Sequence, residues 1–571
     1  MKLHSYLFYS GLLLLTSCNG GTGIEPADIV LVNGGVYTVD AERRWVEAVA
    51  IRDGEIVVVG SNQSVEAYRG ASTEVIDLLG GMALPGLHDT HTHPLEGGYL
   101  LRQCDLSEDG SSVDAIVQVL RQCASESDDE WVIGFGLDLA LFDSNGPDKS
   151  LLDDIAPDRL FFVIAEDGHT VLVNSRVLEL VGITHETPDP PEGVIERRAE
   201  TGEPSGTMRE AAYDLVDVLR PKRQLDNSVA AMRDALAAMT AVGITSFNDV
   251  WVGELELQVY QAIERSGDLK MRIVNSIMDE GVFERHVGAD FERLLAARHD
   301  YSSALINNDS IKIMVDGVLE GETAALVEPY IGLGHRGTLN HSSEELCRRV
   351  QRYDAMGLRI HMHTIGDAAV RAGLDAIEYA REANAGNARS NDLRHTLSHL
   401  ALVQADDIAR FAELEVSASF TGAWAFPSNW VSDLNVPVLG QKRVDRMYPI
   451  GSLHQAGAVV VGGSDWIYGP LSPLDSIEVA ITRQDPDNAN ALIGNTGDSI
   501  DLATAIEAYT TNAAWAMHQE DKVGSIDVGK RADIVVLDRN LFAIPATQIN
   551  EASVRFTIFD GEIVYRQQAT D

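Results

Sequence analysis

The order of apolar and polar positions divides this chain into two β-rich ends and a long middle. Near both ends, short apolar runs alternate with turn signals, and Asp53-Gly54 and Asp560-Gly561 are typical of tight hairpins. Because neither end is long enough for a large core of its own, we expect one small β-sandwich built from residues 28–84 and 515–571. The strands expected there are 29–32, 46–51, 56–59, 532–537 and 554–558.

The middle, residues 85–514, alternates β-branched apolar runs with helical segments, which is the pattern of a parallel sheet with crossover helices. Eight such runs predict an α/β fold, a TIM-like (β/α)8 barrel. The stretch of about 94–235 is too long for one βα loop, so we expect an inserted subdomain after the first barrel strand. The expected barrel strands are 82–93, 243–249, 271–277, 310–316, 358–364, 394–399, 416–420 and 458–465.

Charge narrows the classes of partner. The chain of 571 residues carries 87 acidic against 44 basic side chains, a formal net charge of −43. Nucleic-acid binding needs a basic surface, so this class is excluded. Adhesion to anionic lipid through protein charge is disfavoured for the same reason.

The N-terminus predicts export. An apolar stretch over 6–15 follows Lys2 and is too short to span a bilayer, as in a signal peptide. Leu15-Thr16-Ser17-Cys18 resembles a bacterial lipobox, which implies a signal peptide over 1–17, a lipid on Cys18 and a tether over 18–27. We expect a lipoprotein facing the periplasm, with the outer membrane favoured by Asn19. A plain signal peptide with an incidental cysteine is the alternative.

Three further cysteines bear on that compartment. An oxidising environment permits a disulfide between Cys104 and Cys123, although spacing alone leaves the pairing open. None of the cysteines, including Cys347, lies in a C-x-x-C motif, so thiolate zinc sites are not expected.

Ligand-type residues gather at the ends of the expected barrel strands. His91 and His93 are two apart, so both side chains point to one face of the first strand. At the carboxyl end of a barrel strand they would face the mouth, where two imidazoles suit a divalent metal. Other strands end in His361-Met362-His363, in Leu397-Ser398-His399 and in Gly463-Ser464-Asp465.

The fourth strand carries Lys312 and Asp316 on the face opposite its apolar positions. A lysine inside a barrel is costly unless it is paired or chemically altered. With only 16 histidines in the chain, four or five at strand ends exceed what scatter would give.

This ordered set resembles the amidohydrolase superfamily, and more finely its YtcJ-like branch, which includes N-substituted formamide deformylases. The resemblance covers about residues 28–566. Further stretches that carry it are Asp167-Gly168-His169-Thr170, Gly206-Thr207-Met208-Arg209-Glu210, Gly366-Asp367 and Gly524-Ser525-Ile526-Asp527-Val528-Gly529-Lys530.

The resemblance implies a centre of two divalent metal ions, with zinc favoured over manganese, iron or cobalt. His91 and His93 would hold one metal, His363 and His399 the second, and Lys312, carboxylated by CO2, would bridge them. Asp465 would bind the first metal, take a proton from the bridging water and later protonate the leaving nitrogen. A single-metal site with an ion-paired Lys312 stays an alternative.

Several residues keep two interpretations. His361 competes with His363 as the ligand of the fifth strand, while His88 and His395 read as structural. The residues expected to contact substrate are His169, Arg209, Asp316, Trp424 and Trp466, with Tyr468 nearby; a salt bridge for Arg209 and simple packing for the tryptophans are the alternatives.

The function expected is hydrolysis of a non-peptide carbon–nitrogen bond in a small amide, formamide or cyclic amide. An esterase, lactonase or small-peptide hydrolase on the same metals is the second hypothesis. An inactive exported binding lipoprotein is the third, and the full ligand set argues against it. Substrate identity and oligomeric state stay open.

Overall fold

The computed structural model describes most of the chain. The described ranges are 24–106, 112–126, 130–142, 145–165, 170–190, 193–210, 212–220, 223–279, 291–319, 321–428, 430–488 and 491–568.

Eight parallel strands form the central sheet, and all eight expected barrel strands are present. In spatial order they run from β21 back to β15, with β8 last. Between β8 and β21, Thr90 Oγ1 donates to Gly462 O at 2.9 Å and the Asp465 amide donates to His91 O at 2.7 Å, which nearly closes the barrel. The strands are β8 (Leu87–Thr92), β15 (Ile244–Val252), β16 (Arg272–Met278), β17 (Ile306–Met314), β18 (Arg359–Thr364), β19 (Thr396–His399), β20 (Ser417–Phe420) and β21 (Val460–Gly462).

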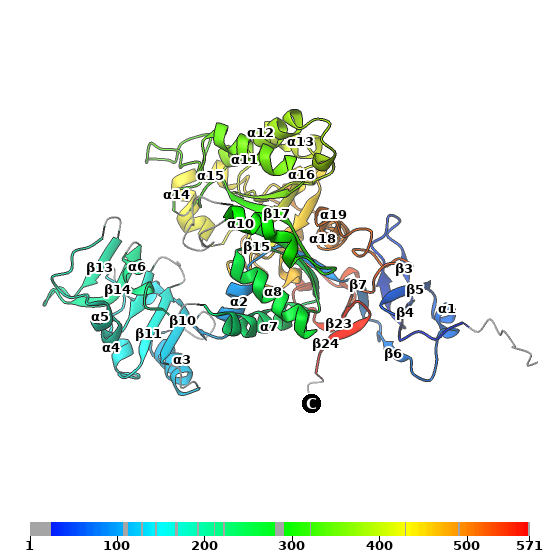
Figure 1. The fold of residues 1–571 in the computed structure, drawn as a ribbon, viewed down its shortest axis with the longest axis horizontal. Helices are drawn as coiled ribbons and strands as arrows, with labels where there is room; N and C mark the ends of the chain where they lie inside the picture. Colours follow the sequence, from blue (N-terminus) through cyan, green and yellow to red (C-terminus); the bar gives the residue numbers. More distant parts are fainter. Residues whose placement is uncertain are drawn as a thin grey trace, which may run out of the picture.

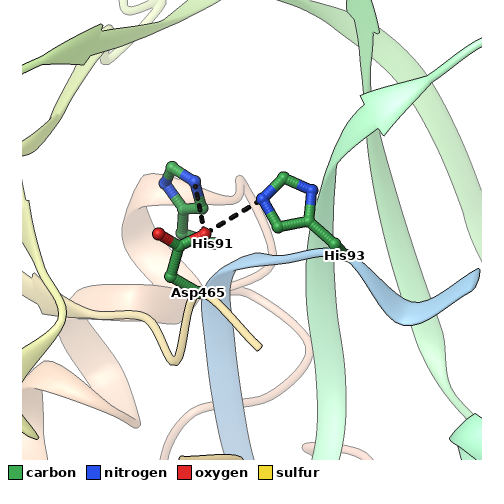
Figure 2. Close-up of side chains that lie close together, drawn as sticks. All are labelled: His91, His93 and Asp465. Atoms are coloured by element: carbon green, nitrogen blue, oxygen red, sulfur yellow. Dashed lines mark hydrogen bonds and ion pairs between the residues drawn. The ribbon is translucent and has the colours of Figure 1, made fainter. Parts of the chain in front are cut away.

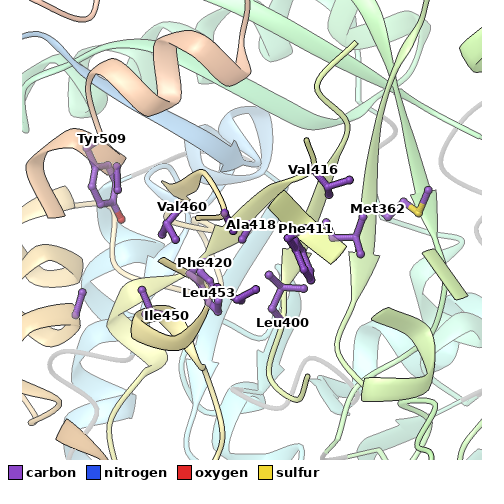
Figure 3. Close-up of a cluster of buried hydrophobic side chains, with 14 of the residues drawn as sticks. Met362, Leu400, Phe411, Val416, Ala418, Phe420, Ile450, Leu453, Val460 and Tyr509 are labelled. Carbon is purple, nitrogen blue, oxygen red and sulfur yellow. The ribbon is translucent and has the colours of Figure 1, made fainter. Parts of the chain in front are cut away.

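Amphipathic helices cover the barrel. In α11 (Ser343–Ala355), Ser342 caps the first turn and Leu346, Val350 and Tyr353 form one buried stripe at helical spacing. Figure 3 shows the same principle around β20, where Phe411, Phe420 and Leu453 belong to one apolar cluster. The other covering helices are α7 (Leu225–Ala241), α8 (Glu254–Ser266), α10 (Phe291–Ala297), α12 (Asp367–Ala383), α13 (Ala405–Glu413), α16 (Ile450–Gln455), α17 (Pro473–Thr482), α18 (Leu502–Ala508) and α19 (Thr511–Ala516). The short helices α14 (Val436–Leu439) and α15 (Gln441–Val444) pack with loop residues such as Tyr330 and Leu402.

Two further sheets build the sandwich from both termini, as expected. One sheet has the order β5-β4-β1-β6, and the other, β24-β23-β22-β7-β2-β3, joins strands from the two ends of the chain. Asp53-Gly54 and Asp560-Gly561 make the expected hairpin turns with left-handed backbones. The strands are β1 (Ile29–Val32), β2 (Gly35–Tyr37), β3 (Trp45–Val46), β4 (Ala48–Arg52), β5 (Glu55–Gly60), β6 (Glu74–Asp77), β7 (Met82–Pro85), β22 (Ile534–Leu537), β23 (Val554–Phe559) and β24 (Glu562–Arg566).

The expectation of one strand over 82–93 is wrong, because the chain changes sheets at Gly86. β7 belongs to the sandwich and β8 to the barrel. A Cβ at Gly86 would lie 2.2 Å from Thr245 Oγ1, so the close approach of β15 requires glycine at the crossing point.

An inserted subdomain follows β8, as expected, and forms a lobe at one end of the molecule, opposite the sandwich (Figure 1). Its six-stranded sheet has the order β13-β14-β12-β11-β10-β9, and a disulfide joins Cys104 to Cys123. At the two ends of the expected insertion of about 94–235, α2 (Pro94–Leu100) and α7 pack against each other, and Leu95 and Met232 share one buried cluster with Phe247 of β15. Its elements are β9 (Cys104–Asp105), α3 (Val113–Glu126), β10 (Trp131–Leu137), α4 (Ser150–Asp153), β11 (Leu160–Ala165), β12 (Thr170–Val173), α5 (Ser175–Val181), β13 (Gly193–Arg197), β14 (Pro204–Glu210) and α6 (Tyr213–Asp217).

Within the described ranges, no helix has both the length and the apolar character that crossing a membrane requires.

Candidate metal centre

Three of the expected ligands meet at the carboxyl end of the barrel (Figure 2). His91 lies on β8, His93 directly after it, and Asp465 follows β21. The Nε2 atoms of His93 and His91 lie 2.9 and 3.4 Å from Asp465 Oδ1. Ligand atoms of all three buried side chains lie within 4.8 Å of one another, close enough to share one metal ion.

The other three expected ligands line the same space. Lys312 Nζ lies 3.3 Å from His91 Nε2, and His399 Nδ1 lies 3.7 Å from Asp465 Oδ2. The rings of His363 and His399 have centroids 4.5 Å apart. The structure therefore brings all six residues together from five different strands.

Backbone strain accompanies this arrangement. Asp465 and His399 have φ values of 51° and 74°, in the left-handed region that ordinary side chains rarely adopt. The Asp465 turn is held by Asp89, whose carboxylate accepts hydrogen bonds from the amides of His91 and Ser464 and from the Ser464 hydroxyl. Such strain persists where the surroundings fix the backbone, and it is common at functional sites.

Burial keeps the imidazoles of His91, His363 and His399 neutral. It lowers the pKa of His363 to about 4 and those of His91 and His399 well below their usual value, and nearby positive groups lower them further. Burial also lowers the pKa of Lys312 to about 7, with Asp465 acting in the opposite direction. Neutral imidazole is the form that binds metals.

His399 supplies the test of whether these residues fit a metal. Both of its ring nitrogens are buried and have no hydrogen-bond partner among the described residues. A buried polar atom without a partner costs about 1–3 kcal/mol, and a coordinated metal would satisfy one of the two nitrogens. Imidazoles with a carboxylate suit zinc, manganese, iron or cobalt, so the donor set fits a divalent ion.

His361 lies deeper than His363. Its Nε2 lies 2.9 Å from His91 Nδ1, whereas the other nitrogen of His91 faces Asp465 and Lys312. This placement favours His363 as the ligand from β18, and that assignment stays a prediction.

His88 and His395, which the sequence indicated as structural, make hydrogen bonds to groups outside the six expected ligands. His88 is fully buried with Nδ1 3.1 Å from Gly86 O. His395 Nδ1 accepts from the Ile360 amide, and its Nε2 lies 3.1 Å from Asp354 Oδ2.

Aromatic side chains lie against the centre. Trp424 stacks on His399, with centroids 5.8 Å apart and planes 13° apart, and donates from Nε1 to Tyr468 O. The exposed Tyr468 ring lies 5.9 Å from His93. Trp466 packs against α2 instead, since a Cβ at Gly97 would lie 2.3 Å from its ring. Trp424 and Tyr468 are therefore better placed to meet a substrate than Trp466.

Asp316, an expected substrate contact, lies beside the centre, with its Oδ1 3.9 Å from His363 Nε2. It lies beyond the end of β17, is 1% exposed, and accepts hydrogen bonds from the amides of Ile365, Gly366 and Ala325. Burial raises its pKa to about 7. By binding these backbone amides, Asp316 holds two loops together. A contact between Asp316 and substrate stays a prediction.

Arg209 lies on β14 in the inserted lobe, and its Nε donates to Glu196 Oε1 at 2.7 Å. Arg209 therefore makes the salt bridge that was the alternative to a substrate contact, and Glu196 is its acidic partner. The two remaining expected residues, His169 and Cys18, lie outside the described residues.

Two residues near the centre were not anticipated from the sequence. Asn248 on β15 has its Nδ2 3.3 Å from His361 Nδ1, and the Trp251 ring lies 6.0 Å from His93. The only available signal was a polar asparagine and an aromatic within an apolar strand, because their partners lie far away in sequence.

Comparisons with known proteins identify the family of the chain. The model of an amidohydrolase family matches residues 74–565. The chain is 30% identical to a putative amidohydrolase YtcJ of Bacillus subtilis over 94% of this chain and 98% of that one. It is 27% identical to an N-substituted formamide deformylase of Arthrobacter pascens, over 95% and 99% of the two chains.

A solved structure shows the same fold. It is an uncharacterized metal-dependent hydrolase from Pyrococcus furiosus, with a TM-score of 0.71 at 24% identity, over 90% of this chain and 99% of that one.

Proposed function

Because this chain belongs to the amidohydrolase family, we propose that it hydrolyses a non-peptide carbon–nitrogen bond in a small amide, formamide or cyclic amide. The proposal rests on the convergence of six ligand-type side chains, among them His399, whose buried ring nitrogens have no hydrogen-bond partner among the described residues. The name of the Arthrobacter relative, a formamide deformylase, supports the choice of bond.

Each side chain has a role in the proposed centre. His91, His93 and Asp465 would hold one divalent ion, and His363 and His399 would hold a second. When bound, such ions polarise a carbonyl and lower the pKa of water from about 15.7 to about 7.

Lys312 is suited to bridge the two positions. The pKa of about 7 leaves much of its amine neutral near pH 7. A neutral amine adds to CO2, forming an N–C bond and releasing one proton, and the resulting carbamate has two anionic oxygens. An unmodified ammonium has no lone pair and cannot be a ligand.

Asp465 is the residue proposed to transfer the proton of the attacking water. Its carboxylate is nearly enclosed and lies between the imidazoles of His93 and His399. We assign it the role of accepting a proton from the attacking water and delivering it to the leaving nitrogen. Trp424 and Tyr468 border the position where the acyl group would lie.

The test combines metal content with turnover. Purified protein, loaded with zinc or manganese in bicarbonate, is expected to hold about two ions per chain by elemental mass spectrometry. Amide and ester analogues of one acyl group are then compared. The Asp465→Asn variant should lose a factor on the order of 10²–10⁴ in turnover.

Asp498→Asn is the matched control, since Asp498 is a buried carboxylate that binds Ser452 away from the centre. Normal rates in Asp465→Asn would remove Asp465 from the mechanism. Hydrolysis of the ester alone would favour an esterase, and folded protein without metal or turnover would favour a binding lipoprotein.

We also propose that a lipid on Cys18 anchors the protein to a membrane facing the periplasm. The proposal rests on the lipobox-like Leu15-Thr16-Ser17-Cys18.

A further inference from the structure

A line of buried polar side chains runs away from the metal centre behind His91. His361 Nε2 lies 2.9 Å from His91 Nδ1, and Asn248 Nδ2 lies 3.3 Å from His361 Nδ1. Ser276 Oγ lies 2.9 Å from Asn248 Oδ1 and 2.8 Å from Ser310 Oγ. All five side chains are at most 6% exposed, and the last four have no part in the proposed chemistry.

The position of His91 dictates the direction of these hydrogen bonds. Its Nε2 faces Asp465 and Lys312, so this nitrogen must offer its lone pair to a metal. A neutral imidazole carries one hydrogen, which must then be on Nδ1 and be donated to His361 Nε2. His361 in turn carries its hydrogen on Nδ1 and needs an acceptor at Asn248.

The side-chain amide of Asn248 has two orientations of equal shape. With Nδ2 toward His361, Asn248 donates to His361 Nδ1 and His361 donates from Nε2 to His91 Nδ1, so the hydrogen of His91 is on Nε2 and blocks coordination. With the amide turned by half a rotation, Oδ1 accepts from His361 and the NH2 group donates to Ser276 Oγ. Only this second direction leaves the His91 lone pair available.

We propose that His361 and Asn248 are positioning residues that fix the tautomer of His91, and that metal binding requires the Asn248 carbonyl to face His361. The inference rests on the proposed function, because it takes His91 as a metal ligand. Partners that orient a metal-binding histidine typically change metal affinity by about 10- to 100-fold when they are replaced.

Two substitutions at one position separate the two directions. Asn248→Asp keeps the shape and can only accept, so it supports the direction that metal binding needs. Asn248→Leu has a similar size and supports neither. If Asn248 instead had to donate to His361, both substitutions would fail equally.

Substitutions of His361 give a second, independent pair of variants. In His361→Gln the side-chain carbonyl can still accept from His91 Nδ1, whereas His361→Leu removes the acceptor. This pair keeps the inference testable if one Asn248 variant does not fold.

The experiment is a zinc competition titration against a chromophoric chelator, on the full chain and the four variants. Thermal unfolding of each metal-free form checks the fold. Asn248→Leu and His361→Leu should bind zinc about 10- to 100-fold more weakly, while Asn248→Asp and His361→Gln stay close to the unsubstituted chain. Two results would overturn the inference: zinc binding that is weakened equally in Asn248→Asp and Asn248→Leu, or zinc binding that is unchanged in both Asn248→Leu and His361→Leu.

Zinc affinity does not depend on turnover. A chain that shows this affinity pattern but hydrolyses no amide would support the positioning role and defeat the proposed function. A chain that hydrolyses amides with equal zinc affinity in all variants would do the reverse.

Discussion

Replacing Arg272 by methionine should loosen the connection between the barrel and the sandwich. Arg272 begins β16, and its Nε and Nη2 donate to the two oxygens of Asp533 at 2.9 and 3.2 Å. Nη2 also donates to Asp560 at 2.9 Å, and the guanidinium lies 5.0 Å from the centre of the Phe559 ring. Methionine keeps the apolar stem and removes all three charged hydrogen bonds.

The size of the effect follows from burial. The side chains of Arg272 and Asp533 are 7% and 1% exposed, so removing the cation leaves a buried carboxylate without its counter-charge. Breaking a buried pair in this way costs about 3–5 kcal/mol. For local opening of the strands next to Asp533 and Asp560, that cost corresponds to an equilibrium constant increased by a factor on the order of 10²–10⁴.

The Lys270→Met variant is the matched control. Lys270 lies two residues earlier and pairs with Glu562 at the start of β24, two residues after Asp560, but the two side chains are 41% and 65% exposed. Exposed pairs contribute about 0–1 kcal/mol. Hydrogen exchange measured by mass spectrometry over 534–537 should therefore accelerate strongly in Arg272→Met and little in Lys270→Met.

The dependence on pH gives a second check. Burial raises the pKa of Asp533, and Arg272 opposes that rise. Without Arg272 the folded-state pKa rises further above the unfolded value, so the stability deficit must grow as pH increases and shrink in acid. Equal exchange in the two variants, or a deficit that grows in acid, would refute the reasoning.

Three other perturbations have expected outcomes. Burial raises the pKa of Asp249 to about 6 from its usual 3.8. Ionisation of this carboxyl therefore destabilises the fold as pH rises between these two pKa values, and above the higher one the loss of stability is about 3 kcal/mol. Asp249→Asn should flatten the urea-midpoint profile between pH 4 and pH 7, and parallel profiles would contradict this. In Gly366→Ala the new Cβ would lie 2.0 Å from Ala325 O, so we expect the free energy of unfolding, measured with denaturant, to fall by about 1–3 kcal/mol. An unchanged midpoint would show that the backbone at Ala325 moves aside at little cost. Cys18→Ser should move the protein from the membrane to the soluble fraction, and unchanged fractionation would end the anchor proposal.

The sequence by itself determined what depends on local periodicity and residue type. Runs of β-branched residues separated by helical stretches predicted all eight barrel strands, because strand and helix periods are local properties. Ligand-type residues at strand ends predicted the centre, since the carboxyl ends of parallel strands meet at one edge.

Only the tertiary structure decided what depends on partners distant along the chain. The chain changes sheets at Gly86, where the close approach of Thr245 requires a glycine. Asp316 binds the amides of a neighbouring loop, and Arg209 pairs with Glu196 in the inserted lobe. The spacing of His361 and His363 puts both on one face of β18 and cannot distinguish them. Asn248 and His91, brought in from other strands, give His361 its partners and leave His363 beside His399.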